Sequence, residues 1–283
     1  MTVALFDPPG PRARRRILIG SIAGTAVMAL AIYGIVAKLA EAGQFTEAYW
    51  EPFTRSGVQR ILWNGLLATL KAAGLALVLA LTLSTLLASA RMSRLAPVRI
   101  IAMLFVEFFR AMPLLLLVFF AFLGLPRFGL DIGPFGSLVI ALTLYNGSVL
   151  AEIFRAGVDA VPKGQVEAAF SLGLSKATVF RRIQMPQAVR MMLPTIISQF
   201  VVLLKDTSLG FIVAYEELLR SGKLIYTNIG NVVPTAIVMT VIYVSINLVL
   251  SAVATYIEHR QRRKGRTATV HTDVPPEIGV GQI

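Results

Sequence analysis

The sequence predicts an all-α membrane protein with six transmembrane helices. The mean hydropathy is +0.72, and only 15% of the 283 residues are charged, whereas soluble domains carry about a quarter. Uncharged runs of bilayer length recur along the chain, and the charged residues stand in short segments between them. Because a helix of about 20 apolar residues crosses the hydrocarbon core, each of these runs is a candidate span.

The N-terminal segment predicts a membrane anchor over residues 17–40. Residues 1–16 are polar and end in four arginines, and residues 17–37 carry no charge. A basic start before an apolar run is also the pattern of a cleaved secretory signal, but this run is longer than the apolar region of about 7–15 residues that signals contain. We therefore expect a retained helix behind a cytoplasmic basic N-terminus, with a cleaved signal as the alternative.

Five further apolar runs predict spans over residues 64–90, 100–123, 132–151, 191–204 and 231–257. The only charged residues within them are Lys71 in the first and Glu107 and Arg110 in the second. The run at 191–204 is shorter than a bilayer crossing requires. Short or broken membrane helices often end near the midplane, where backbone and hydroxyl groups line a cavity. After the last span, residues 258–283 are basic and then contain proline and threonine, which predicts a disordered cytoplasmic tail.

The distribution of Lys and Arg predicts the orientation. If the N-terminus lies inside, the four inner segments together contain 18 of these residues and the three outer segments contain 6. Positive charge accumulates on the cytoplasmic side of membrane proteins. Both termini and the long polar segment at residues 161–186 are therefore expected in the cytoplasm, and residues 41–60 outside.

Two short helices are predicted within residues 161–186. Pro162 stops the preceding helix because proline lacks an amide donor. The next residues have helix-forming composition, Gly173 stands where a glycine would end that helix, and Ser175 is suited to cap a second one. Pro186 is expected to mark the end of the second helix.

The spacing of this segment resembles the EAA loop of bacterial importer permeases driven by an ATP-binding cassette. The family pattern is E-A-A-x3-G-x9-I-x-L-P, and this chain departs from it only in having Met185 in place of leucine. The resemblance implies a cytoplasmic helix pair that docks on a dimeric ATPase through Glu167, Ala168, Ala169, Gly173, Ile183 and Pro186. The alternative is an ordinary basic loop between two spans.

Over residues 60–257 the chain also resembles the polar amino-acid branch of these permeases. The resemblance rests on the segments 107–113, 145–148, 151–153, 162–165 and 205–209. The sequences of 106–113 and 144–152 are similar to those of permeases for glutamate. It implies a five-helix type I importer core, to which residues 17–40 add an N-terminal helix. It also implies a second permease subunit, identical or related, an extracytoplasmic binding protein, and alternating access that carries a polar amino acid, glutamate first among the candidates.

Polar residues within the spans are candidates for the substrate pathway. Charges at membrane depth are costly and face a partner or the bundle interior. An amino acid needs a cation for its carboxylate and an anion for its ammonium group, and residues 205–208 supply both with two hydroxyls. The candidates are Lys205, Asp206, Thr207, Ser208, Arg110, Asn146 and Ser148. Each has a structural alternative: Arg110 pairs with Glu107 three residues earlier, Lys205 and Asp206 mark the outer water interface, and Asn146 and Ser148 bond a neighbouring helix.

Several function classes are disfavoured. The net charge is +12, but the basic residues are scattered between apolar runs, which argues against nucleic-acid binding. The chain has no cysteine and two histidines near its end, so we expect no metal site. It lacks the G-x-x-x-x-G-K-[ST] loop, so ATP and Mg²⁺ are expected on the partner ATPase, and this chain is not expected to be an enzyme. The main rival is an ion-coupled secondary carrier or channel, for which internal repeats are expected but none is clear.

Overall fold

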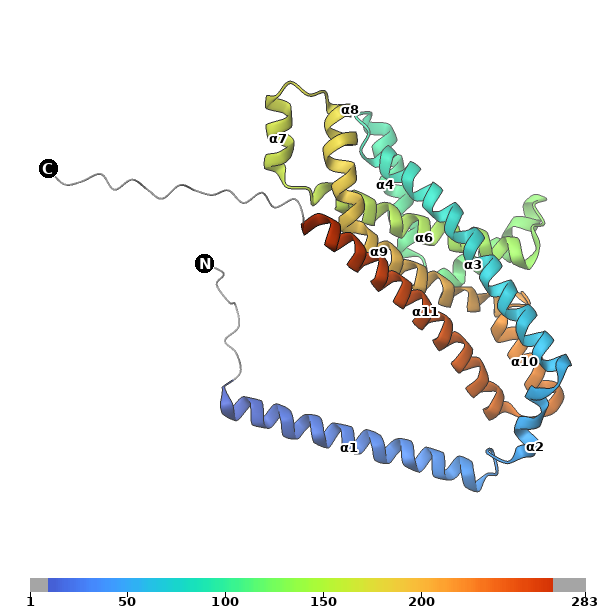
Figure 1. Cartoon of the computed structure of the whole chain (residues 1–283). Coiled ribbons are helices and arrows are strands. Elements are labelled where there is room, and N and C mark those ends of the chain that lie inside the picture. The colour runs from blue at the N-terminus through green and yellow to red at the C-terminus, as the bar shows by residue number, and fades with distance from the viewer. Residues whose placement is uncertain (1–9, 267–283) are drawn as a thin grey trace.

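A computed structural model describes residues 10–266, and every regular element within them is helical (Figure 1). The longer helices, in chain order, are α1 (Pro11–Glu41), α3 (Ser56–Arg91), α4 (Ala96–Ala111), α6 (Gly133–Asp159), α9 (Met185–Asp206), α10 (Leu218–Ile229) and α11 (Val232–Arg266). The shorter ones are α2 (Glu47–Trp50), η1 (Glu51–Thr54), α5 (Leu114–Phe119), η2 (Phe120–Gly124), η3 (Leu125–Phe128), α7 (Lys163–Ser171), α8 (Lys176–Val179), η4 (Phe180–Gln184) and η5 (Thr207–Val213).

Five helices in the described part are long and apolar enough to cross a membrane, and a bent pair is a sixth candidate. The five are Pro11–Glu41, Ser56–Arg91, Gly133–Asp159, Lys176–Val213 and Val232–Val253. The prediction of an all-α membrane fold with six spans is therefore confirmed. In Figure 1, α7 and α8 lie at one end of the bundle and α2 and α10 at the other. We call these the EAA-loop end and the opposite end.

The bent pair corrects the predicted third span, which was expected to run straight over residues 100–123. The helix Ala96–Ala111 and the helical segment Leu114–Phe128 meet at 102°. Pro113 lies at the break, and Met112 before it has extended backbone with ψ 135°. Proline disfavours helical geometry in the preceding residue and cannot donate to the helical ladder. The sequence Met-Pro therefore turns the chain where a continuous helix was expected.

The fifth span is also longer than predicted. α8, the π-turn η4, α9 and the 3-10 helix η5 form one continuous helical segment, Lys176–Val213. The expected boundary at Pro186 was wrong, because this residue occupies the first turn of α9, where a proline N–H is not needed. The π-turn just before it accommodates the change in the hydrogen-bond ladder. The uncharged run at 191–204 is thus the middle of a longer helix that begins in the EAA loop.

The two terminal helices extend beyond the predicted limits. α1 begins at Pro11, within the basic segment expected to precede the span, and none of its residues is buried. Figure 1 shows α1 apart from the other helices and joined to them through α2. α11 continues to Arg266, so part of the tail predicted to be disordered is helical. The rest of that predicted tail, residues 267–283, lies outside the described residues.

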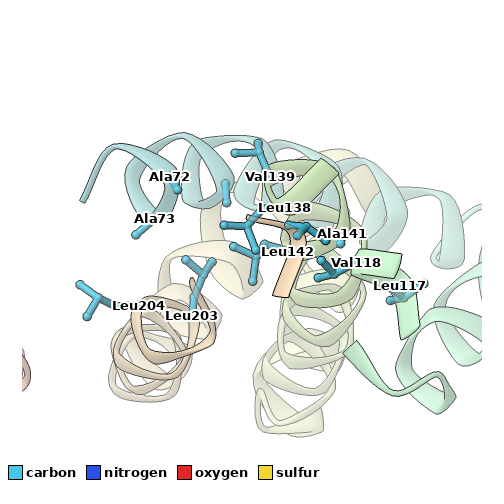
Figure 2. Close-up of a cluster of buried hydrophobic side chains, with 12 residues drawn as sticks. Ala72, Ala73, Leu117, Val118, Leu138, Val139, Ala141, Leu142, Leu203 and Leu204 are labelled. Atoms are coloured by element: carbon cyan, nitrogen blue, oxygen red, sulfur yellow. The ribbon is translucent and has the colours of Figure 1, made fainter. Parts of the chain in front are cut away.

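Small side chains allow α3 to pack closely against α6. Ala72, Ala76 and Ala80 recur every fourth residue on α3 and are fully buried, as expected for one face of a helix. Ala72 and Ala76 are packed with Leu138 and Leu142 of α6 in a cluster to which α5 and α9 also contribute (Figure 2). Ala80 is packed with Leu150 of α6 in a second cluster. Small residues at helix contacts let membrane helices approach closely, which strengthens their van der Waals packing.

A second buried cluster joins α6 to α9 nearer the EAA loop. Here Gly157 of α6 lies directly against Met192 of α9, and a Cβ atom on Gly157 would be 2.1 Å from the Met192 Cγ. The two helices therefore have a contact that a larger side chain at position 157 would disrupt. Through this contact the fifth span, which begins in the EAA loop, is packed against the central helix of the bundle.

Candidate functional site

The turn between α7 and α8 has the geometry predicted from the sequence. Gly173 has a φ of +76°, and its N–H donates to the Phe170 carbonyl at 2.9 Å. The next amide, of Leu174, donates to the Ala169 carbonyl at 3.2 Å. These two bonds form a Schellman motif, whose left-handed residue is usually glycine. No atom lies within 4 Å of a Cβ built on Gly173, so the backbone conformation alone selects glycine here.

The second helix of the loop is capped, and the first is tied to α9. Ser175 accepts a hydrogen bond through its Oγ from the Thr178 N–H at 3.3 Å, which confirms the predicted cap. The Gln187 Nε2 atom of α9 donates to the Gln165 Oε1 atom of α7 at 2.7 Å and to the Ile183 carbonyl at 3.0 Å. The side-chain contact holds the first short helix against the base of α9.

The residues of the predicted coupling motif divide into exposed and inward-facing groups. Glu167, Ala168 and Pro186 are exposed, Ile183 is half-buried, and Ala169 is buried. Beside them the loop exposes three apolar side chains, Phe170, Leu172 and Leu174, of which Leu172 is 80% exposed. Exposed apolar residues grouped at one end of a bundle are typical of a protein contact site.

A cluster of ion pairs lies next to the EAA loop, on the half of α6 that leads into it. Glu152 accepts bonds from Arg91 of α3 and, at 2.6 Å, from Arg155 of α6. Arg110 at the end of α4 lies 3.9 Å from the Glu152 carboxylate and 3.5 Å from that of Glu107. The cluster thus links α3, α4 and α6, and the predicted Glu107–Arg110 pair is one edge of it.

Asn146 and its neighbours lie deeper in the bundle. Asn146 is fully buried; its Nδ2 donates to the Leu142 carbonyl at 3.0 Å and its Oδ1 accepts from the Gln199 Nε2 of α9 at 2.9 Å. The side chain therefore joins α6 to α9. Ser148 is also buried, and its Oγ has no hydrogen-bond partner in the described part of the chain. The same holds for the Thr143 Oγ1 and the Asn247 Oδ1 atoms.

Residues 205–208 follow at the end of α9. Lys205 is exposed and Asp206 half-buried, and neither takes part in an ion pair within residues 10–266. Thr207 is buried and donates through its Oγ1 to the Leu204 carbonyl at 2.6 Å. Ser208 is half-buried in η5.

The candidate pathway residues are distributed along the bundle axis. The Asn146–Gln199 bond fixes a common level on α6 and α9. At 1.5 Å per residue, Glu152 with its partner Arg110 lies roughly 9 Å toward the EAA loop, and Asp206 about 10 Å toward the opposite end. The structure therefore brings Arg110 together with the ion-pair cluster, and it does not bring the seven residues into one pocket.

Glu217, a buried acid at the opposite end of the bundle, was not among the residues predicted from the sequence. Its carboxylate caps α10 by accepting from the N–H groups of Leu219 (2.7 Å) and Arg220 (2.8 Å), and it also accepts from the Tyr243 hydroxyl at 2.9 Å. Burial raises the pKa of Glu217, and these bonds oppose the shift. The sequence did contain a signal for this cap, because an acidic residue just before a helix interacts favourably with the helix dipole. Glutamate is, however, a less common cap than Ser, Thr, Asp or Asn.

The family follows from a match over most of the bundle. Residues 80–263 match the model of the binding-protein-dependent transport system inner membrane component. The chain belongs to this family. The permease is 39% identical to the glutamate transport system permease protein GluD of Corynebacterium glutamicum, over 79% of this chain and 83% of GluD. It is 35% identical to the L-cystine transport system permease protein TcyB of Bacillus subtilis, over 72% of this chain and 87% of TcyB.

A solved structure agrees with the sequence matches. The permease is similar to the structure described as an amino acid ABC transporter with histidines, with a TM-score of 0.69 and 31% identity over 71% of this chain and 94% of that one. It is therefore a multi-pass cell-membrane protein, the permease subunit of an amino-acid importer. Members of this family are not themselves catalytic, and they act with an ATPase and a substrate-binding protein.

Proposed function

We propose that the permease imports an acidic amino acid by alternating access driven by a separate ATPase dimer, and that glutamate is the first candidate for this substrate. The observation that carries this proposal is the paired-helix EAA loop at one end of a bundle whose fifth span begins in the loop itself. A movement of α8 imposed by the ATPase would pass directly into α9, because the two are continuous. Glutamate is supported by the likeness to GluD.

The exposed face of the loop supports ATPase docking. Phe170 and Leu172 offer apolar contact next to the exposed Glu167, a combination suited to a groove with an apolar floor and a polar rim. ATP and Mg²⁺ would bind the ATPase, since this chain has no phosphate-binding loop. A docked ATPase closing on ATP would rotate the loop and thereby rearrange the spans.

The surface of α11 supports a second permease subunit. Only 6% of its apolar window is buried, and Val241, Leu248 and Val249 are about half to two-thirds exposed. In the membrane this face would contact lipid or the other permease subunit, identical or related. The extracytoplasmic binding protein would deliver substrate to the opposite end. From there the substrate would pass, in order, residues 205–208, then Asn146 with Ser148, and then Arg110.

Reconstitution tests the proposed function. The permease should be assembled in proteoliposomes with its ATPase and binding protein, and uptake of labelled glutamate, glutamine and cystine compared. ATP-dependent uptake that prefers glutamate is expected. Uptake by the permease alone, driven by an ion gradient, would instead support the secondary carrier.

The orientation has its own test. The chain contains no cysteine, so a single one introduced as Lys163→Cys reports which side of the membrane the exposed start of α7 faces. We expect an impermeant thiol reagent to label this cysteine only after the cells are broken open. An external control, Glu47→Cys, should react in intact cells. Labelling of Lys163→Cys from outside would show that the topology is inverted.

Lys205 is expected to bind a substrate carboxylate. Lys205→Met keeps the length and apolar volume of the side chain and removes its charge. Loss of one charge-assisted hydrogen bond should reduce uptake efficiency by about tenfold or more, and Asp206→Asn should act similarly if it binds the ammonium group. Lys38→Met is the matched control, since Lys38 is an exposed lysine near the end of α1. Unchanged uptake in well-assembled Lys205→Met and Asp206→Asn complexes would remove these residues from the pathway.

A further inference from the structure

A charged cavity lies between the start of α3 and α10. Figure 1 shows α10 at the end of the bundle opposite the EAA loop. Its volume is about 350 Å³, within the range of small-molecule sites. The helices touch closely beneath it, because a Cβ atom on Gly65 of α3 would lie 2.2 Å from the Ser221 Oγ atom of α10. Both residues are buried and form part of the lining. The cavity thus has a firm base formed by two packed helices.

Three charged residues line this cavity: Glu216, Arg220 and Lys223. None of them takes part in an ion pair within residues 10–266. Arg220 and Lys223 are three residues apart on α10 and so share one face of the helix. The neighbouring acid, Glu217, is buried and already accepts three hydrogen bonds. Glu217 does not line the cavity, and Glu216 is the only carboxylate among the lining residues.

The polar groups around these charges are suited to a small ligand. Asn64 of α3 and Thr227 of α10 line the same cavity and are exposed. The Lys223 ammonium lies 5.1 Å from the centre of the Phe211 ring of η5, a cation–π contact that restricts where the lysine side chain lies. Because η5 begins at Thr207, this contact also places the cavity beside the segment that follows Lys205 and Asp206.

We propose that this cavity is an outer binding site for an acidic amino acid, separate from the pathway residues deeper in the bundle. Arg220 and Lys223 would each bind one carboxylate, and Glu216 would bind the ammonium group. Two cations and one anion match the charges of glutamate or aspartate, and ionised pairs form the stronger hydrogen bonds. The inference rests on the proposed function, in that the substrate is taken to be acidic.

Protection of a single cysteine from labelling tests the site in the assembled complex. Thr227→Cys should react with an impermeant thiol reagent, and saturating glutamate should slow the reaction by about tenfold. Aspartate should protect similarly. Glutamine should protect at least tenfold less well at equal concentration, because it lacks the second carboxylate. Arg127→Cys, an exposed control on η3 outside this cavity, should react at the same rate with and without glutamate.

Charge variants identify which residues carry the protection. Arg220→Gln and Glu216→Gln, each combined with Thr227→Cys, should raise the glutamate concentration needed for protection by about tenfold or more. Unchanged protection in both would overturn the site. The site would also be overturned if glutamate still protected these variants normally but the binding protein no longer associated with them, because the charges would then serve docking of that protein. Glutamate uptake by the unmodified complex, measured in parallel, tests the proposed function separately, so a failed site and a wrong substrate give different results.

Discussion

Gly173→Val is expected to abolish ATP-driven uptake while the protein still inserts in the membrane. The residue has a φ of +76° between α7 and α8, and a β-branched side chain resists that conformation by more than about 1 kcal/mol. The Schellman bonds that end α7 would then be lost or displaced, and with them the angle between the two short helices. Because α8 continues into α9, the change would uncouple the loop from the span that it is proposed to move.

Two further variants show whether the backbone conformation is responsible. Gly173→Asn should retain more uptake than Gly173→Val, because asparagine enters the left-handed region more readily. Gly57→Val adds the same side chain at the start of α3, where nothing lies within 4 Å of the new Cβ atom, and should leave uptake intact. The measurements are uptake in proteoliposomes and recovery of the ATPase with the purified permease. Normal uptake and ATPase recovery in Gly173→Val would refute the proposed coupling role of this turn.

The turn at Gly173 was predictable because its determinants are local. A helix-forming segment, a glycine at C′ and a serine cap stand within a few residues of one another, and the structure forms the motif that each of them favours. The membrane spans were predictable for a similar reason, since hydropathy acts along a continuous run of residues. Both features depend on sequence neighbours alone.

The errors in the spans arise where one local signal has two outcomes. Pro113 breaks its helix by 102°, whereas Pro186 is tolerated in a continuous helix next to a π-turn. The sequence shows a proline after a methionine in both places. Which outcome occurs depends on packing by other helices, and that information is not contained in the dipeptide. The length of the fifth span was misjudged because the polar residues at its start belong to the helix rather than to a loop.

The side-chain contacts of the candidate pathway could be predicted only in part. Asn146 was recognisable as a polar residue in an apolar span, but its partner Gln199 lies 53 positions away in the chain. The Glu107–Arg110 and Glu152–Arg155 pairs follow from helical spacing. The contact of Glu152 with Arg91, across 61 positions, required the packed bundle. Sequence therefore indicated which residues needed partners more readily than it indicated the partners.

Glu152→Gln is expected to cause the largest loss of stability among these variants. The change leaves Arg91, whose side chain is only 9% exposed, without the one ion-pair partner it has among the described residues. Removing one member of a buried pair costs about 3–5 kcal/mol, because the other charge remains buried and uncompensated. The Glu152 side chain is 22% exposed, so we expect the lower end of this range. For a protein of this size that corresponds to a fall in Tm of roughly 6–12 °C.

A double variant and a surface control distinguish a lost pair from general damage. Arg91→Met added to Glu152→Gln should recover part of the stability, since no buried guanidinium then remains without a partner. Glu51→Gln breaks the 2.8 Å pair with Arg55, whose side chains are 51% and 61% exposed, and should change Tm little. Thermal unfolding of the purified permease in detergent measures all three. If the double variant is no more stable than Glu152→Gln, Arg91 is not the group that the Glu152 carboxylate stabilises, and the link between α3 and α6 depends on the packing of Ala80 and Leu150 instead.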